Sequence, residues 1–216
     1  MNTSIKQHAS ALWSDFKTID IRSIAIGFAL VLTLALSACS PSPQFLNQNV
    51  TGSGYATQVE LNNANGGTLR LSAPTPNQVT VLFFGFTQCP DVCPTTLGTM
   101  KLVKQGLIKN KVDADRLRIV FVSIDPERDT PEVLKAYAAA FDPAVMGAFT
   151  SADNTQKIAK DFNIVYEKVG TGPFYTMNHS ANAYLIDSDG RTRVSIPYGT
   201  TAPVIAHDVQ QLLSMK

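Results

Sequence analysis

The pattern of apolar and polar positions between residues 68 and 124 predicts strands and a helix in alternation. Residues 68–72 alternate apolar and polar side chains, which is typical of a half-exposed strand. Residues 79–86 and 116–124 are nearly continuous apolar runs, as expected of strands buried on both faces. Between these runs, residues 95–110 repeat apolar side chains at helical spacing. The order strand, helix, strand predicts a parallel βαβ crossover and therefore an α/β fold.

The pattern continues with helices and a hairpin towards the C-terminus. Residues 129–141 begin with Asp-Thr-Pro-Glu, a capping residue followed by proline, and continue as a predicted helix. A short amphipathic helix is predicted over 154–162 and a final helix over 202–215. The runs 183–187 and 192–196 flank a glycine-containing turn, which predicts a β-hairpin.

The first 38 residues have the features of an export signal. Basic residues at positions 6, 17 and 22 precede the apolar run 23–36, which is shorter than the roughly 20 residues of a membrane-spanning helix. The sequence Leu-Ser-Ala-Cys that ends at Cys39 resembles the lipobox of bacterial lipoproteins, in which the cysteine is acylated. We therefore expect residues 1–38 to be a lipoprotein-type export signal and Cys39 to carry a lipid.

The remaining chain is expected to contain a tether and one domain. Residues 39–54 are rich in Pro, Ser, Asn, Gln and Gly, which suits a flexible tether, and the domain is predicted over 55–216. Hydrophobic residues make up 44% of the chain, charged residues 16%, and the formal net charge is +1. This composition is that of a globular protein and excludes a basic nucleic-acid-binding protein. We predict that the protein is located in the cell envelope, as a membrane-anchored lipoprotein that faces the periplasm or the cell exterior.

Two cysteines follow the second predicted strand. Cys89 and Cys93 come directly after the run 79–86 and before the predicted helix, so both thiols lie at a strand-to-helix junction. Open α/β sheets bind ligands at such junctions, and a helix N-terminus favours the thiolate by lowering the pKa of a cysteine. Pro94 fits the first helical position if Cys93 is the cap, which leaves 89–93 as a loop. This loop permits either a disulfide or two thiolates on one metal ion.

The cysteine pair favours copper if it binds a metal. Two soft thiolates suit Cu(I), whereas a structural zinc ion normally has four protein ligands. A third ligand then comes from His179 or His207. His207 lies within the final predicted helix, where nothing else indicates a site. His179 lies in the polar segment 175–180, where a loop can face the cysteines, and we predict it as the third ligand.

Three segments together resemble the signature sequences of the Sco/SenC copper proteins. Residues 85–97 (GFTQCPDVCPTTL) resemble the cysteine motif, residues 122–131 (VSIDPERDTP) the second motif, and Asn178-His179-Ser180 the histidine motif. The segments occur in the same order over roughly residues 55–216, so the resemblance covers the whole predicted domain.

The resemblance implies a fold, a cargo and partners. It implies a thioredoxin-like fold, with a central mixed β-sheet flanked by helices and an extra β-hairpin. It also implies one copper ion per domain, Cu(I) or Cu(II), bound by Cys89, Cys93 and His179 and delivered to the binuclear copper centre of cytochrome c oxidase. The expected partners are the copper-site subunit of the oxidase, a copper donor and a thiol reductant of the envelope, and the membrane through the lipid anchor.

The second motif contains polar residues that helix capping does not explain. A helix start accounts for Asp129 and Pro131, but not for Asp125, Glu127 and Arg128. We expect these three residues to belong to a partner-docking loop.

Other functions of the cysteine pair remain open. The leading alternative is a thiol-disulfide oxidoreductase, an enzyme in which Cys89 and Cys93 are the catalytic redox pair and form a disulfide. General thioredoxins, however, have two residues between their cysteines and a proline opposite, whereas this chain has three and no proline in 176–178. A peroxidase is disfavoured because Pro90 stands where peroxiredoxins have threonine. A purely structural disulfide, with His179 an ordinary loop residue, gains little from closing so short a loop.

Overall fold

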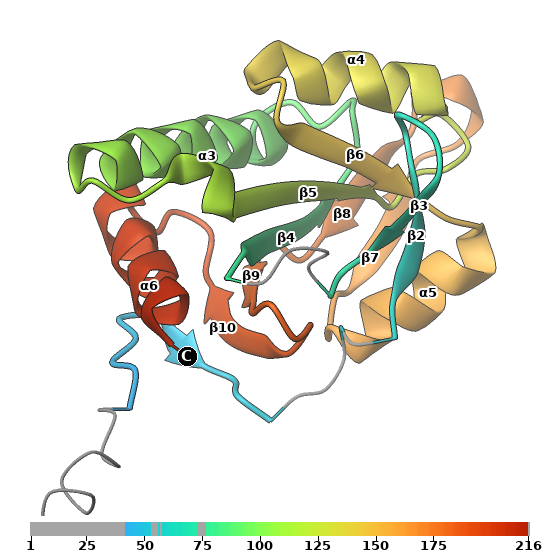
Figure 1. Cartoon of the computed structure of the whole chain (residues 1–216). Coiled ribbons are helices and arrows are strands. Elements are labelled where there is room, and N and C mark those ends of the chain that lie inside the picture. The colour runs from blue at the N-terminus through green and yellow to red at the C-terminus, as the bar shows by residue number, and fades with distance from the viewer. Residues whose placement is uncertain (1–41, 53–55, 57, 73–76, 216) are drawn as a thin grey trace, which may run out of the picture. The chain divides into compact units, whose positions relative to one another are not determined.

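The computed structural model describes residues 42–52, 56, 58–72 and 77–215, and Pro43–Lys216 form one compact unit (Figure 1). The strands are β1 (Gln48–Asn49), β2 (Glu60–Asn63), β3 (Thr68–Arg70), β4 (Val79–Gly85), β5 (Leu117–Ser123), β6 (Val145–Phe149), β7 (Tyr166–Val169), β8 (Thr176–His179), β9 (Ala183–Ile186) and β10 (Thr192–Ile196). The helices are α3 (Val92–Lys109), α4 (Pro131–Phe141), α5 (Ala152–Asp161) and α6 (Ala202–Ser214), and two 3-10 turns are η3 (Ala114–Arg116) and η4 (Gly172–Phe174).

Within the described residues the strands form one mixed sheet of eight and a separate pair. The order in the sheet is β1-β10-β9-β4-β5-β6-β2-β3. β4, β5 and β6 run parallel at its centre, and the neighbours on both sides are antiparallel. β7 and β8 pair only with each other. The prediction of a central mixed sheet flanked by helices, with an extra hairpin, is confirmed.

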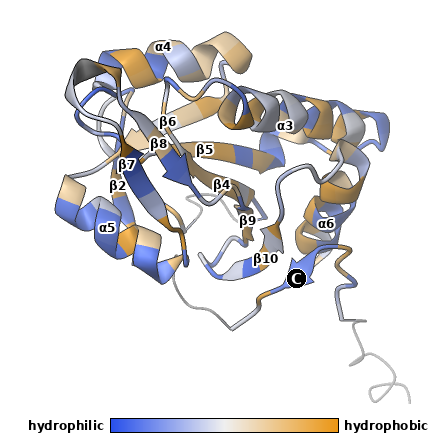
Figure 2. Cartoon of the chain, turned by 180° about the vertical axis from the view of Figure 1, so that it is seen from behind, coloured by the Kyte–Doolittle hydropathy of each residue, from blue (hydrophilic) through white to orange (hydrophobic). Residues whose placement is uncertain are grey.

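Two apolar cores cover the two faces of this sheet. In β4, Val81 and Phe83 face the core formed with α3, α4 and α6, whereas Leu82 and Phe84 face the core formed with α5, β2, β3 and β8. The alternation follows from the two-residue period of a strand, and it explains why β4 is buried throughout and mostly apolar. Figure 2 shows that α5, which lies at the surface of the second core, carries mainly hydrophilic residues. The central strands β4 and β5 are therefore buried on both faces, as their apolar runs predicted.

The βαβ crossover is confirmed, but its helix begins earlier than predicted. β4 and β5 pair in parallel over seven residues on each strand, and α3 connects them. The N-cap of α3 is Asp91, so Cys93 lies inside the first turn and is not the cap. The first helical hydrogen bond runs from the Thr95 N–H to the Asp91 carbonyl. Pro94 comes before this residue, so its lack of an N–H costs the helix no hydrogen bond.

The remaining predicted elements are found with shifts of a few residues at their ends. The Thr130 side chain accepts a hydrogen bond from the Val133 N–H, which caps α4 as its Asp-Thr-Pro-Glu start predicted. β9 and β10 form the predicted hairpin, and its turn places Gly190 at φ +78°, where a side chain would be strained. Strands β2, β6, β7 and β8 were not predicted. Each has only four or five residues, too few for a clear pattern.

Part of the segment predicted as a tether lies in the folded unit. Within 39–54, residues 48–49 form β1 and pair with β10. The buried carboxylate of Asp208 in α6 accepts hydrogen bonds from the backbone N–H groups of Leu46, at 2.7 Å, and Asn47, at 3.0 Å. These residues therefore do not form a flexible tether. Their backbone N–H groups supply hydrogen bonds that the buried carboxylate of Asp208 needs, and these bonds hold the segment against α6.

The predicted export signal (1–38) and the predicted lipid site at Cys39 lie outside the described residues. Among the helices of the part that the structure describes, none is long and apolar enough to cross a membrane.

Candidate metal centre

Cys89 and Cys93 lie at the carboxyl end of the central strand β4. Cys89 follows the strand in a turn closed by a hydrogen bond from its own N–H to the Phe86 carbonyl, at 3.2 Å. Cys93, in the first turn of α3, is fully buried, whereas Cys89 is half-buried. The Cys93 N–H has no carbonyl partner within α3 and instead donates to the Cys89 Sγ, 3.4 Å away. Both cysteines are free thiols in the structure.

His179 reaches the cysteines from the opposite side of the sheet. It is the last residue of β8, whereas a loop was predicted, and the hairpin of β7 and β8 packs on the α5 core. Cys93 belongs to the α3 core, and Cys89 contacts both cores. The site thus lies at the edge of the sheet where the two layers meet, the position that open α/β sheets use for ligands.

The three side chains converge on one point. One ligand atom from each of Cys89, Cys93 and His179 lies within 4.8 Å of the others, and this is the one cluster of at least three His, Cys, Asp or Glu side chains found among the described residues. The Cys93 Sγ and the His179 Nε2 are 3.9 Å apart. His207 lies on α6 beside Asp208 and takes no part in the cluster. The structure therefore brings together the three residues predicted as ligands, in a geometry that can hold one small metal ion.

The imidazole of His179 presents a lone pair to the thiols. Its Nδ1 lies 2.8 Å from the Ser180 carbonyl, which can only accept, so Nδ1 carries the proton and donates. The Nε2 that faces Cys93 is then unprotonated. Burial lowers the pKa of His179, although the hydrogen bond to Ser180 opposes this, so the ring stays neutral at neutral pH. A neutral imidazole with its second nitrogen fixed by a carbonyl is the usual form of a metal-ligating histidine.

The thiol of Cys93 differs from the expectation at a helix N-terminus. Burial raises the pKa of Cys93 well above its usual range, while a backbone hydrogen bond from Phe86 opposes the rise. Desolvation thus outweighs the helix terminus, because the sulfur is shut away from water. Without a metal ion Cys93 is a thiol, and a bound cation supplies the charge that its thiolate needs.

Asp129 holds the loop that leads to Cys89. Its carboxylate accepts hydrogen bonds from the Thr87 Oγ1–H at 2.5 Å, from the Thr87 N–H, and from the Ser123 Oγ–H at 2.6 Å. Burial raises the pKa of Asp129, and the hydrogen bonds from Ser123 and Thr87 counteract this. Asp129 therefore positions the cysteine loop against the end of β5.

Asp125 and Arg128 hold the hairpin that carries His179. The Tyr175 hydroxyl donates to Asp125 at 2.5 Å, and the Arg128 Nε donates to the same carboxylate at 2.6 Å. Arg128 also donates to the Tyr175 carbonyl and to Gln88 Oε1 beside Cys89, and its guanidinium lies 3.5 Å from the centre of the Tyr175 ring. Asp125 and Arg128 point into the molecule, which differs from the docking loop expected for them, whereas Glu127 is exposed and pairs with Lys168 of β7 at 2.7 Å. The second motif instead joins the cysteine loop to the histidine hairpin.

We predict that Tyr175→Phe weakens the contact between the β7–β8 hairpin and the second motif, residues 122–131. Loss of the Tyr175 hydroxyl leaves the buried Asp125 without one of its hydrogen-bond donors, which should lower the free energy of unfolding by about 1–3 kcal/mol. Copper affinity should fall by about 10-fold, because His179 follows four residues later in the same hairpin. Urea unfolding and Cu(I) competition with a chelator measure the two effects. Tyr166→Phe, in the facing strand, is the matched control, and equal losses in both variants would contradict the prediction.

Gly85 is a site residue that the sequence analysis did not single out. A Cβ at this position would collide with the Cys93 Sγ and would lie 2.7 Å from Cε2 of Phe121. The last residue of β4 must therefore be glycine for α3 to bring Cys93 against the strand. The signal in the sequence that could have identified Gly85 was its position four residues before Cys89.

The fold and the site define a thioredoxin-like domain with a candidate metal centre of two thiols and one imidazole at the end of its central strand. A family model described as SCO1/SenC matches residues 51–214, and the chain belongs to this family.

Individual relatives agree with this assignment. A SCO2-like protein of Rickettsia felis is 34% identical over 184 residues, which cover 81% of this chain and 86% of that protein. The structure of Bradyrhizobium japonicum ScoI with copper bound is similar with a TM-score of 0.62 and 35% identity, covering 71% of this chain and 96% of that one. Apo Sco1 of Thermus thermophilus is similar with a TM-score of 0.63 and 31% identity, covering 80% and 99%.

Proposed function

We propose that this protein binds one copper ion through Cys89, Cys93 and His179. The observation that carries the proposal is the convergence of two sulfur atoms and an unprotonated imidazole nitrogen within 4.8 Å. Two soft sulfur ligands and one imidazole suit Cu(I), and a three-ligand site leaves room for an incoming ligand. The copper-bound structure of the Bradyrhizobium relative, at 35% identity, supports copper as the metal.

We further propose that the copper is cargo for the binuclear copper centre of cytochrome c oxidase. Because Cys89 and His179 are half-buried and Cys93 is fully buried, an acceptor ligand can approach from the Cys89 and His179 side. Transfer then proceeds by ligand exchange, in which acceptor side chains replace the three donors one at a time. A lipid on Cys39, after removal of residues 1–38, would anchor the domain to a membrane of the cell envelope, where it would face the periplasm or the cell exterior.

Copper binding should release at least one proton at neutral pH. The Cys93 sulfur is protonated without metal because burial raises its pKa, and it must lose that proton to bind copper as a thiolate. His179 does not contribute to this proton release, because its lowered pKa leaves the ring neutral before copper binds. The apparent Cu(I) affinity should therefore rise with pH by about tenfold per unit for each proton released. Calorimetry in buffers of different ionisation enthalpy measures the release, and a pH-independent affinity between pH 6.5 and 8 would contradict it.

A thiol-disulfide oxidoreductase is the second candidate function. It is favoured by two free thiols whose sulfur atoms lie within 4.8 Å of each other, with Cys89 half-buried and open to a partner. In this role the reduced pair would keep oxidase or other envelope cysteines reduced and would itself become a disulfide.

One experiment separates the two functions. The protein loaded with Cu(I) is mixed with the reduced, copper-free copper-site domain of the oxidase, and the apo protein with the same domain oxidised to its disulfide. Delivery predicts that copper moves in the first mixture at a stoichiometry of one per protein. Reduction of the disulfide in the second mixture, without copper movement in the first, would overturn delivery in favour of the oxidoreductase.

A further inference from the structure

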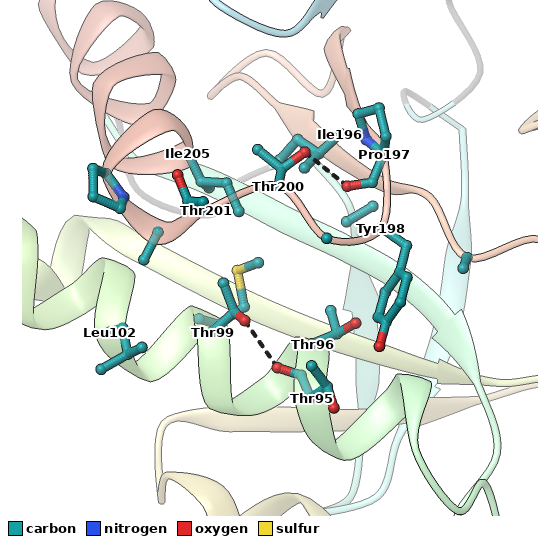
Figure 3. A pocket seen from close by; sticks show the side chains of 16 residues that line it. Thr95, Thr96, Thr99, Leu102, Ile196, Pro197, Tyr198, Thr200, Thr201 and Ile205 are labelled. Carbon is teal, nitrogen blue, oxygen red and sulfur yellow. Dashed lines mark hydrogen bonds between the residues drawn. The ribbon is translucent and has the colours of Figure 1, made fainter.

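A pocket of about 430 Å³ opens between the first half of α3, the N-terminus of α6 and the loop that follows β10 (Figure 3). Its floor includes Met100 and Ile205, which are both 1% exposed. Its rim includes Leu102 and Tyr198, which are 55% and 44% exposed and rank among the exposed large apolar side chains of the described chain. An apolar floor with an apolar rim that is open to solvent can accept an apolar side chain of a partner.

The threonines of the pocket do not make it polar. On α3, the hydroxyls of Thr96 and Thr99 donate to the carbonyls of Val92 and Thr95, one helical turn earlier. Hydroxyls bonded in this way are already satisfied, so the walls offer mainly methyl groups. Figure 3 shows Thr99 bonded back to the helix and Thr200 bonded to Pro197. None of the 16 described residues that line the pocket is charged, so it suits an uncharged apolar side chain.

Two residues that line the pocket are close in sequence to candidate ligands of the metal centre. Its lining begins with Thr95, two residues after Cys93, and includes Ala181, two residues after His179. Two residues of extended chain span roughly 7 Å. Thr95 and Ala181 therefore lie within about this distance of Cys93 and His179, so a polypeptide that places a ligand atom at the metal centre can reach the pocket with a residue two or three positions away.

We infer that this pocket receives an apolar side chain of the protein that exchanges copper with the site. The occupant is a polypeptide segment with a cysteine ligand and a leucine-like or aromatic side chain two or three residues from it. This inference rests on the proposed copper exchange, since it is the exchange that brings a partner's ligand to the site. The absence of charge in the lining disfavours an acidic or basic segment, because burying its charge without a partner is costly.

Disulfide tethering tests the pocket without copper. In the full chain with Cys93→Ser, Cys89 is the remaining thiol of the pair, and it is half-buried, within reach of a peptide. Peptides of sequence acetyl-Cys-Gly-X-Gly-amide are supplied as mixed disulfides with 2-mercaptoethanol, with X as leucine or aspartate. The Cys89 sulfur displaces 2-mercaptoethanol and forms a disulfide with the peptide, so one disulfide replaces another and nothing is oxidised overall. Mass spectrometry then gives the fraction of protein that carries each peptide at equilibrium.

The inference predicts that the leucine peptide is captured at least about 10-fold more strongly than the aspartate peptide. Leu102→Glu, at the rim, and Thr99→Phe, which fills the pocket, should each abolish this preference. Ile108→Glu should preserve it, since Ile108 is 63% exposed on the same helix but lies outside the pocket. Equal capture of the two peptides, or a preference that survives both pocket variants, would overturn the inference.

A copper measurement distinguishes failure of this inference from failure of the proposed function. Copper stoichiometry is measured separately on the wild type and on the Leu102→Glu protein, and both should hold one ion. If neither protein binds copper but the leucine preference is found, the copper proposal fails and the pocket stands as a peptide site. If both bind copper and the preference is absent, the docking inference fails alone.

Discussion

His179→Ala is expected to lower the Cu(I) affinity by more than about 100-fold. Loss of a residue that only orients a ligand typically costs 10- to 100-fold in metal affinity, so the loss of a ligand itself should cost more. The structure offers no replacement, because the described residues bring no other histidine, cysteine or carboxylate into the cluster. Cys89→Ser and Cys93→Ser should show losses of the same order. Competition with a chromophoric Cu(I) chelator measures all three affinities.

His207→Ala is the matched control for this prediction. His207 lies on α6 beside Asp208, away from the cluster, so its loss should leave the copper affinity within about threefold of the wild type. Thermal unfolding of each apo variant shows whether the fold is intact. Wild-type affinity in a folded His179→Ala protein would remove His179 from the ligand set.

Gly85→Ala is expected to damage both the fold and the metal centre. The added Cβ would collide with the Cys93 Sγ and approach Cε2 of Phe121 to 2.7 Å, in a place where the strand and α3 are already in contact. Overpacking of this kind typically lowers the free energy of unfolding by about 1–3 kcal/mol. Because relief of the clash must move the Cys93 sulfur, the copper affinity should also fall, by about 10- to 100-fold.

Gly98→Ala separates this clash from the general effect of replacing a glycine. A Cβ at Gly98, within α3, has no neighbour within 4 Å, so alanine should raise the free energy of unfolding by up to about 1 kcal/mol and leave copper binding unchanged. Denaturant unfolding and chelator competition measure both variants. The account of Gly85 would be wrong if the two alanine variants had the same stability and the same copper affinity.

The central elements of the fold could be predicted because their sequence patterns are long. β4 and β5 are seven-residue strands that are mostly apolar, and α3 is an eighteen-residue helix, so the buried runs and the helical spacing are both visible in the sequence. β7 and β8 have four residues each and pair only with each other, so their side chains carry little pattern. That hairpin nevertheless carries His179, and its position depends on contacts that a local pattern does not contain.

The candidate ligands could be predicted from residue type and spacing, but their supports could not. Cys89 and Cys93 are separated by three residues, and this spacing is visible in the sequence. The bond from Tyr175 to Asp125 crosses 50 positions, and the bond from Thr87 to Asp129 crosses 42. Such pairs become neighbours only when the strands that carry them assemble, so their roles required the structure.

The most direct test of the central claim is X-ray absorption spectroscopy at the copper edge of the protein loaded with one equivalent of Cu(I). Coordination by Cys89, Cys93 and His179 predicts a three-coordinate Cu(I) ion with two sulfur scatterers and one nitrogen scatterer from an imidazole, and loss of the imidazole signal in His179→Ala. A first shell of nitrogen and oxygen alone, or a wild-type spectrum identical to that of His179→Ala, would contradict the proposed site.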